Sequence, residues 1–357
     1  MKKIILILLI FTLLGSTLMG CSRDNTDILQ TKENHAYLEV LVEGFPNYVF
    51  HLYSVAGIGY ENEYGAVYKE TVKKDDREYL SQNKELLGFA NGRFGSLAPA
   101  FLFVPLYINP KSKEEVKEYF RLLNQALEKE EYSVFIDKYS EKLNNINEYW
   151  VPFNAKEYLQ EITQFKEVVK RISDIYVNNY DNYIERVWSV EKEKLISKRE
   201  KLIKEIDEYN LIEKWQEATG KSFKYSVYQI VLCSANESGA NAVSVAYERN
   251  HFYYEPNTKI NHLVEYISHE VGTHLLFDTF KKVMSSGKYE YSLVYKAYES
   301  LAAFYNNKII FSNRDLSVDF DDYDEVHFFE IYNQIHKNTP DISLEELLVK
   351  GIEEYSR

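Results

Sequence analysis

The spacing of apolar residues predicts a chain that is helical over most of its first half. Residues 112–131 and 155–219 repeat apolar positions every three or four residues, which is typical of amphipathic helices. Ser112 and Glu115 form a capping-box pattern at the start of the first of these segments, and Gly220 is placed to end the second. We therefore expect long helices here, two or three of them in the second segment.

Shorter apolar runs with partial alternation predict a few strands, most of them in the second half of the chain. We expect these strands at residues 36–43, 226–234, 242–247 and 251–254. Helices are expected after them at residues 258–285, 292–308, 322–337 and 344–355. This order predicts an α+β fold, mostly helical, in which a small mixed sheet precedes the helix at 258–285.

That helix carries the segment Y-I-S-H-E-V-G-T-H-L-L-F, which contains His269, Glu270 and His274. Zinc peptidases commonly place two His residues four apart on a helix, where both imidazoles point the same way and share one zinc ion. The Glu that follows the first His then takes a proton from the zinc-bound water. The segment therefore suggests a zinc site with Glu270 as its general base.

The two His residues are five apart here, and this spacing changes the expected geometry. On a regular helix, five residues place the side chains roughly 140° apart. Shared zinc ligation would require one extra residue in the helix, which a π-type turn eased by Gly272 would absorb. The alternative is a chance match, because short motifs of this kind recur without function.

A third ligand is expected from a following helix, where Glu299 stands in the segment A-Y-E-S-L-A-A-F. A single carboxylate among Ala, Leu and Phe needs a partner, and a zinc ion is one. An ion pair with a Lys or Arg residue would serve equally well. The sequence leaves both readings open.

The segments H-E-V-G-T-H and Y-E-S-L-A resemble H-E-[IV]-G-T-H and Q-E-G-L-A of the metallopeptidase family that includes the microtubule-associated tyrosine carboxypeptidases. More distantly, the pattern is similar to that of dipeptidyl peptidase III, which also uses H-E-x-x-x-H with a later Glu. Both are of the gluzincin type. The resemblance implies zinc-dependent peptide hydrolysis, with His269, His274 and Glu299 as ligands and Glu270 as the base.

The resemblance covers only these two segments, and Tyr298 and Ser300 replace the family's Gln and Gly, so substrate specificity does not carry over. It also suggests that residues 242–247 form an edge strand that aligns a peptide by main-chain pairing. Tyr323 and His327 are candidates for stabilising an oxyanion. For both, a structural or surface role is the alternative.

The N-terminus predicts export. Lys2 and Lys3 precede an apolar run, and L-M-G-C at residues 18–21 matches the L-x-[AG]-C pattern of bacterial lipoprotein signals, with lipid on the Cys21 thiol. An ordinary signal peptide or a short anchor helix is the alternative. We expect a signal peptide at 1–20, a tether at 21–34, a mainly helical region at 35–220 and a zincin-like catalytic region at 221–357.

Composition and charge narrow the class of protein. The formal net charge is -13 and no basic stripe with interleaved aromatics is present, which argues against nucleic-acid binding. With Cys21 lipidated, Cys233 is the one remaining thiol, so no internal disulfide can form. Cys233 stands in a strand-like apolar run, and we expect it to be a small buried residue.

These observations predict a zinc metallopeptidase that is lipid-anchored to the cell membrane on its extracytoplasmic face and acts on a peptide or protein substrate. The alternative is a catalytically inactive zincin-like lipoprotein that serves in binding or assembly at the cell envelope. A solute-binding lipoprotein would need an alternating series of strands and helices, which the chain lacks.

Overall fold

The computed structural model describes residues 36–59, 63–90, 93–149, 154–235, 242–253, 259–310 and 323–357. These residues belong to one compact unit that spans 36–357. The predicted signal peptide, Cys21 and the tether lie outside the described residues, so the lipid anchor stays a prediction. Within the described ranges, no helix combines the length and the apolar character needed to cross a membrane.

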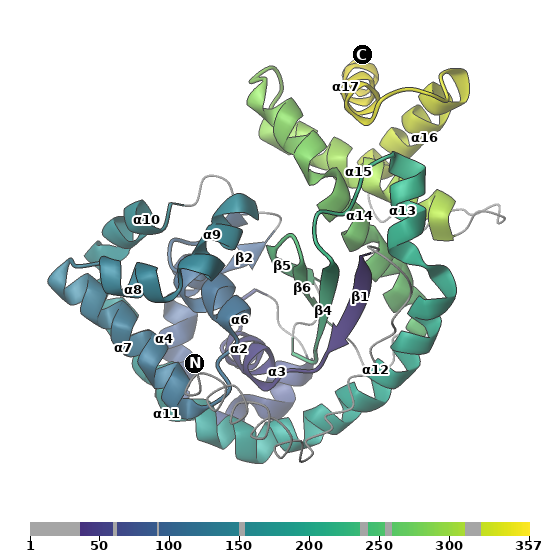
Figure 1. The fold of residues 1–357 in the computed structure, drawn as a ribbon. Coiled ribbons are helices and arrows are strands. Elements are labelled where there is room, and N and C mark those ends of the chain that lie inside the picture. The colour runs from purple at the N-terminus through teal and green to yellow at the C-terminus, as the bar shows by residue number, and fades with distance from the viewer. Residues whose placement is uncertain are drawn as a thin grey trace, which may run out of the picture. The chain divides into compact units, whose positions relative to one another are not determined.

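One four-stranded sheet runs through the otherwise helical unit (Figure 1). Its order is β1-β4-β6-β5, with β4 parallel to both β1 and β6 and with β5 antiparallel to β6. The strands are β1 Tyr37–Leu41, β4 Val227–Cys233, β5 Ala242–Ala246 and β6 Arg249–Tyr253. The predicted α+β fold, mostly helical with a small mixed sheet, is confirmed.

Short helices and turns dominate the first part of the chain. The helices are α2 Gly44–Val55, α3 Glu63–Tyr68, α4 Lys74–Gln82, α5 Lys84–Leu87, α6 Val104–Ile108, α7 Lys113–Lys129, α8 Ser133–Lys138, α9 Ser140–Tyr149, α10 Ala155–Ile162 and α11 Lys166–Tyr183. A small hairpin pairs β2 Phe89–Ala90 with β3 Arg93–Phe94. Two π-helical segments also occur, at Pro99–Phe103 and Ile184–Trp188.

Further helices follow. They are α12 Ser189–Tyr209, α13 Leu211–Thr219, α14 Ile260–Ser285, α15 Tyr291–Ile310, α16 Tyr323–Asn338 and α17 Leu344–Tyr355. All the helices predicted after residue 258 are present, with bounds shifted by a few residues at most.

Two predicted helix ends have the expected chemistry. Ser112 is the N-cap of α7, where its hydroxyl accepts a hydrogen bond from the Glu115 amide at 3.2 Å. The Glu115 carboxylate in turn accepts from the amide of Lys111 at 2.8 Å. Gly220 ends α13 with a φ of 64°, a left-handed conformation that glycine adopts at little cost. The sequence predicts both helix ends correctly because capping depends on residues that are close together in the chain.

The sheet separates two hydrophobic clusters, since alternate residues of a strand point to opposite faces. Helix α2 packs on one face of the sheet and α12 on the other. The first cluster takes Val231, Cys233, Val243 and Val245 from the sheet. The second takes Val40, Tyr228, Ile230, Leu232 and Phe252. Both clusters therefore depend on the same few strands.

The second hydrophobic cluster contains residues from both of the predicted regions, 35–220 and 221–357. Val40 of β1 and residues of α12 and α13 belong to the cluster that also contains α14 and α15. Parts of the chain on both sides of Gly220 thus share one core. The boundary as drawn from the sequence stays a prediction.

Cys233 is fully buried at the end of β4 and is a free thiol. Burial raises its pKa well above the usual range, so the thiol stays protonated and unreactive near neutral pH. This agrees with its expected place as a small apolar core residue.

Helix α14 is α-helical along its whole length, so the predicted π-type turn near Gly272 is wrong. The reason is the packing of Trp215 from α13. A Cβ atom on Gly272 would lie 2.1 Å from the indole, and the indole nitrogen donates to the Ser268 hydroxyl at 3.0 Å. Ser268 and Gly272 face one indole only while the helix keeps its regular four-residue spacing. Gly272 provides room for Trp215 rather than a distortion.

Gly272→Ala should lower the free energy of unfolding by about 1–3 kcal/mol, because the added methyl group overpacks the indole. Urea denaturation measures the loss. In a Trp215→Phe background the same substitution should cost less, since the smaller ring leaves space. An equal loss in both backgrounds would show that Trp215 is not the reason for the glycine.

Candidate functional site

His269 and Glu299 meet where α14 packs against α15. The two helices are neighbours along the chain and pack side by side (Figure 1). The His269 Nε2 atom lies 3.2 Å from the Glu299 carboxylate oxygen Oε2, and both side chains are about three-quarters buried. The sequence left the partner of Glu299 open between a metal ion and a Lys or Arg residue. In this structure an imidazole from the predicted site takes that place.

Tyr295 also bonds to Glu299, from one turn earlier on α15. The charge of Glu299 and the burial of the phenol raise the pKa of Tyr295, so this hydroxyl stays protonated and donates to the carboxylate. Glu299 therefore accepts bonds from two neighbours and is held in place between the helices.

Glu270 lies beside this pair and faces the sheet. Asn250 of β6 donates from its amide nitrogen to Glu270 Oε2 at 3.1 Å, and Tyr266 also bonds to the carboxyl group. Burial raises the pKa of Glu270 to about 7, with His269 opposing the shift and the Glu299 charge adding to it. A carboxyl group with this pKa can accept and release a proton near neutral pH, as a general base must.

His274 is 3% exposed and is held on the sheet side of α14. Its Nδ1 atom lies 2.7 Å from the backbone oxygen of Tyr247, and its Nε2 atom lies 2.7 Å from the Ser244 hydroxyl. A carbonyl oxygen only accepts, so Nδ1 carries the proton and Nε2 presents a lone pair. Burial lowers the pKa of His274 to about 4, which keeps the ring neutral at pH 7.

Tyr149, at the end of α9, covers the Nε2 side of the His274 ring. Its hydroxyl lies 3.4 Å from Nε2, and its ring packs against the imidazole at 5.0 Å between centroids. It also stacks on Phe277 of α14. The C-terminal end of α9 thus covers part of the site.

The four predicted side chains fit zinc in the kind of donor that they supply, two imidazoles and two carboxylates. The Nδ1 bond from His274 to a backbone carbonyl is also the arrangement that orients metal-binding imidazoles. Their positions fit only in part. Among the described residues, no three His, Cys, Asp or Glu side chains come close enough together to hold a metal ion. The regular helix directs His274 toward Ser244 and away from His269.

The remaining candidates lie elsewhere or outside the described side chains. His327 of α16 packs against the ring of Tyr355 of α17, and the side chain of Tyr323 is not described. His262 is exposed on α14. His251 is buried on β6 against Phe50 of α2, with its Nδ1 atom 3.1 Å from the Val243 oxygen. His251 therefore faces α2, whereas the charges of His262 and His269 both act on Glu265 of the same helix.

Strand β5 is an edge of the sheet, as the predicted alignment of a peptide requires. Helices α6 and α9 pack against it, and most of its residues are buried. Its role in holding a peptide stays a prediction.

The sequence reasoning missed several polar neighbours of the site. Tyr266 and Tyr295 each stand four residues before a site carboxylate on the same helix, a spacing that would have found them. Ser244, Asn250 and Tyr149 reach the site from β5, β6 and α9. Their approach depends on the sheet register and on helix packing, for which the local sequence gives no signal.

No protein-family model, no curated protein and no solved structure matches this chain. The gluzincin resemblance of the two short segments therefore stays a prediction, and the site is argued from its own residues.

The raised pKa of Glu270 predicts a pH-dependent penalty in the metal-free protein. The folded state holds the proton up to about pH 7, whereas the unfolded chain releases it near pH 4.5. Relative to Glu270→Gln, the wild type should lose stability as pH rises from 4.5 to 7, by at most about 3 kcal/mol, and no further above pH 7.

Denaturation of both proteins in a chelator across this pH range tests the prediction. The titration of His274 occurs in both proteins and cancels in the difference. A difference in unfolding free energy that stays constant with pH would contradict the proposed environment of Glu270.

Proposed function

We propose that the protein is a zinc-dependent metallopeptidase, with His269, His274 and Glu299 as the metal ligands and Glu270 as the general base. The observation that carries the proposal is the contact between His269 and Glu299, which come from different helices and lie beside a carboxyl group with a pKa near 7. A helix that needed these polar side chains only for solubility would expose them instead.

When bound, zinc would polarise the scissile carbonyl and make water a better nucleophile near neutral pH. The chain's own residues supply the proton chemistry. The Glu270 carboxylate is oriented by Asn250 and Tyr266, and it takes a proton from the attacking water and returns it to the leaving amine. Burial raises the pKa of this carboxyl group in the metal-free protein, and the charge of a bound zinc ion would lower it.

His274 would have to move before it could bind the same metal ion as His269 and Glu299. Its proton is fixed on Nδ1 by the Tyr247 carbonyl, so its Nε2 lone pair is the one available to a metal ion. That atom now accepts a bond from Ser244. Zinc ligation by all three residues requires His274 to leave Ser244 and turn toward His269, a change that the regular course of α14 does not itself provide.

A non-catalytic binding or assembly protein on the same scaffold is the second candidate. The observation that favours it is the regular course of α14, which keeps His274 bonded to Ser244 and Tyr247 without any metal ion. In that case the buried polar cluster would be structural. The two candidates differ in zinc content and in peptide cleavage.

Native mass spectrometry of the purified protein should show one zinc ion per chain. His269→Ala, His274→Ala and Glu299→Ala should each lose it, because each removes one protein ligand. His262→Ala is the matched control, since it removes an exposed imidazole from the same helix and should leave the zinc in place. Zinc that persists in both His269→Ala and Glu299→Ala would contradict the assigned ligands.

Glu270→Gln should keep the zinc ion and lose peptide cleavage by a factor on the order of 10² or more, because the amide cannot accept the proton. Cleavage of a peptide library, followed by liquid chromatography and mass spectrometry, measures the loss. A zinc-loaded wild type that cleaves no peptide, with an intact fold, would support the non-catalytic candidate.

A further inference from the structure

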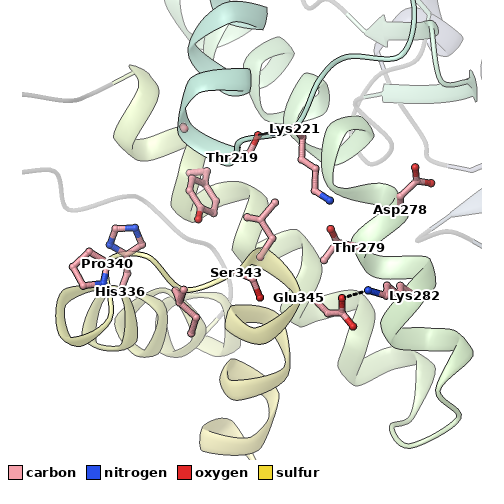
Figure 2. A pocket seen from close by; sticks show the side chains of 13 residues that line it. Thr219, Lys221, Asp278, Thr279, Lys282, His336, Pro340, Ser343 and Glu345 are labelled. Carbon is pink, nitrogen blue, oxygen red and sulfur yellow. Dashed lines mark hydrogen bonds and ion pairs between the residues drawn. The ribbon is translucent and has the colours of Figure 1, made fainter.

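A cavity of about 410 Å³ lies among α13, α14, α15 and the start of α17, on a part of α14 that follows the site (Figure 2). None of His269, Glu270, His274 and Glu299 lines it. Its size is that of a pocket for a small organic molecule. The polar, charged and apolar side chains of its wall decide which molecule it can bind.

Thr279 of α14 supplies a polar group that has no structural task. The residue is 4% exposed and lines the cavity. In the part of the chain that the structure describes, its hydroxyl has no hydrogen-bond partner. A helical threonine commonly satisfies its hydroxyl on a carbonyl of the preceding turn, which this one does not do. The hydroxyl is free to bond with a molecule in the cavity.

Within the described part of the chain, the charged residues in the wall leave one lysine without an ion pair. Lys282 forms an ion pair with Glu345, which joins α14 to α17. Asp278 accepts from the Tyr247 hydroxyl at 2.9 Å and pairs with Lys281. Lys221 follows α13, and no ion pair involves it among the described residues. Figure 2 shows its side chain extending toward Thr279. The wall thus offers a positive charge beside a free hydroxyl.

Two helix ends lie at the cavity. The first residues of α17, Leu344 and Glu345, line it. Ser343 already caps this N-terminal end, however, and Glu345 and Glu346 in the first turn offset its partial positive charge. The C-terminal end of α13 also lies here, where carbonyl groups would repel an anion. Two of those carbonyls are already engaged, Trp215 by the Thr219 hydroxyl and Gln216 by the Gly220 amide.

The other side of the cavity is apolar. Ile342 and Leu344 contribute aliphatic side chains, and Tyr305 of α15 contributes an aromatic ring. His336 of α16 also lines the cavity, where burial and the nearby Lys308 lower its pKa, so it adds no positive charge at pH 7. The walls therefore combine an end that carries Lys221 and the Thr279 hydroxyl with an apolar side.

We propose that this cavity binds a small carboxylate with an apolar body, whose anionic group bonds to the Thr279 hydroxyl and is attracted by Lys221. The inference does not depend on the proposed peptidase activity, because the two sites share no residue.

Binding of phenylacetate to the full chain, followed by ligand-observed NMR titration, tests the proposal. Thr279→Val should weaken binding roughly tenfold, because it removes the hydroxyl and keeps the shape of the side chain. Thr279→Ser should restore most of the affinity. Lys221→Gln should weaken binding several-fold in low salt and less in high salt. Lys117→Gln, an exposed lysine on α7, is the matched control and should leave binding unchanged.

Thermal unfolding separates binding from folding. Because the Thr279 hydroxyl has no partner among the described residues, Thr279→Val should keep or raise the melting temperature, whereas loss of a structural hydroxyl would lower it. Phenethylamine, which carries a positive group on a similar body, should not bind. Three results would overturn the proposal. The first is that phenylacetate fails to bind the wild type. The second is that Thr279→Val and Lys221→Gln both bind phenylacetate as tightly as the wild type does. The third is that inorganic phosphate binds as tightly as phenylacetate.

Discussion

The loss of water around Glu270 is the physical constraint on which the candidate site depends. Burying a carboxyl group between helices and beside another carboxylate costs free energy, unless the group is neutral or hydrogen-bonded. Hydrogen bonds to Glu270 come from Asn250 and Tyr266, and an opposite charge comes from the nearby imidazole of His269. The same burial brings the pKa of Glu270 near 7, so the environment that makes the residue costly also suits it to proton transfer.

Close packing around α14 creates this environment. On one side Gly272 admits the indole of Trp215, and on another the Tyr298 hydroxyl of α15 donates to the Thr273 carbonyl at 2.6 Å. The sheet supplies Asn250 and Ser244 on the face that meets α14. Three sets of neighbours, Trp215, α15 and the sheet, thus fix the position and rotation of α14. Regular packing holds His269 near Glu299 and His274 near Ser244.

Local chemistry explains what the sequence could predict. The cap at Ser112, the stop at Gly220 and the helix that carries His269 all depend on residues close together in the chain. The sequence marks Glu299 as a carboxylate in need of a partner and leaves open whether that partner is a metal ion or a Lys or Arg residue; the structure places it beside His269. The course of α14 could not be predicted locally, because the role of Gly272 depends on Trp215, which is more than fifty residues away. The orientation of His274 likewise depends on the register of β5 against β6, which no local pattern fixes.

A crystal structure of the zinc-loaded protein, with anomalous data at the zinc absorption edge, tests the central claim most directly. The account predicts one peak, with His269, His274 and Glu299 side chains within about 2.0–2.2 Å of it and the Ser244 bond of His274 released. A structure without a peak at this place, in which His274 still bonds to Ser244, would contradict it.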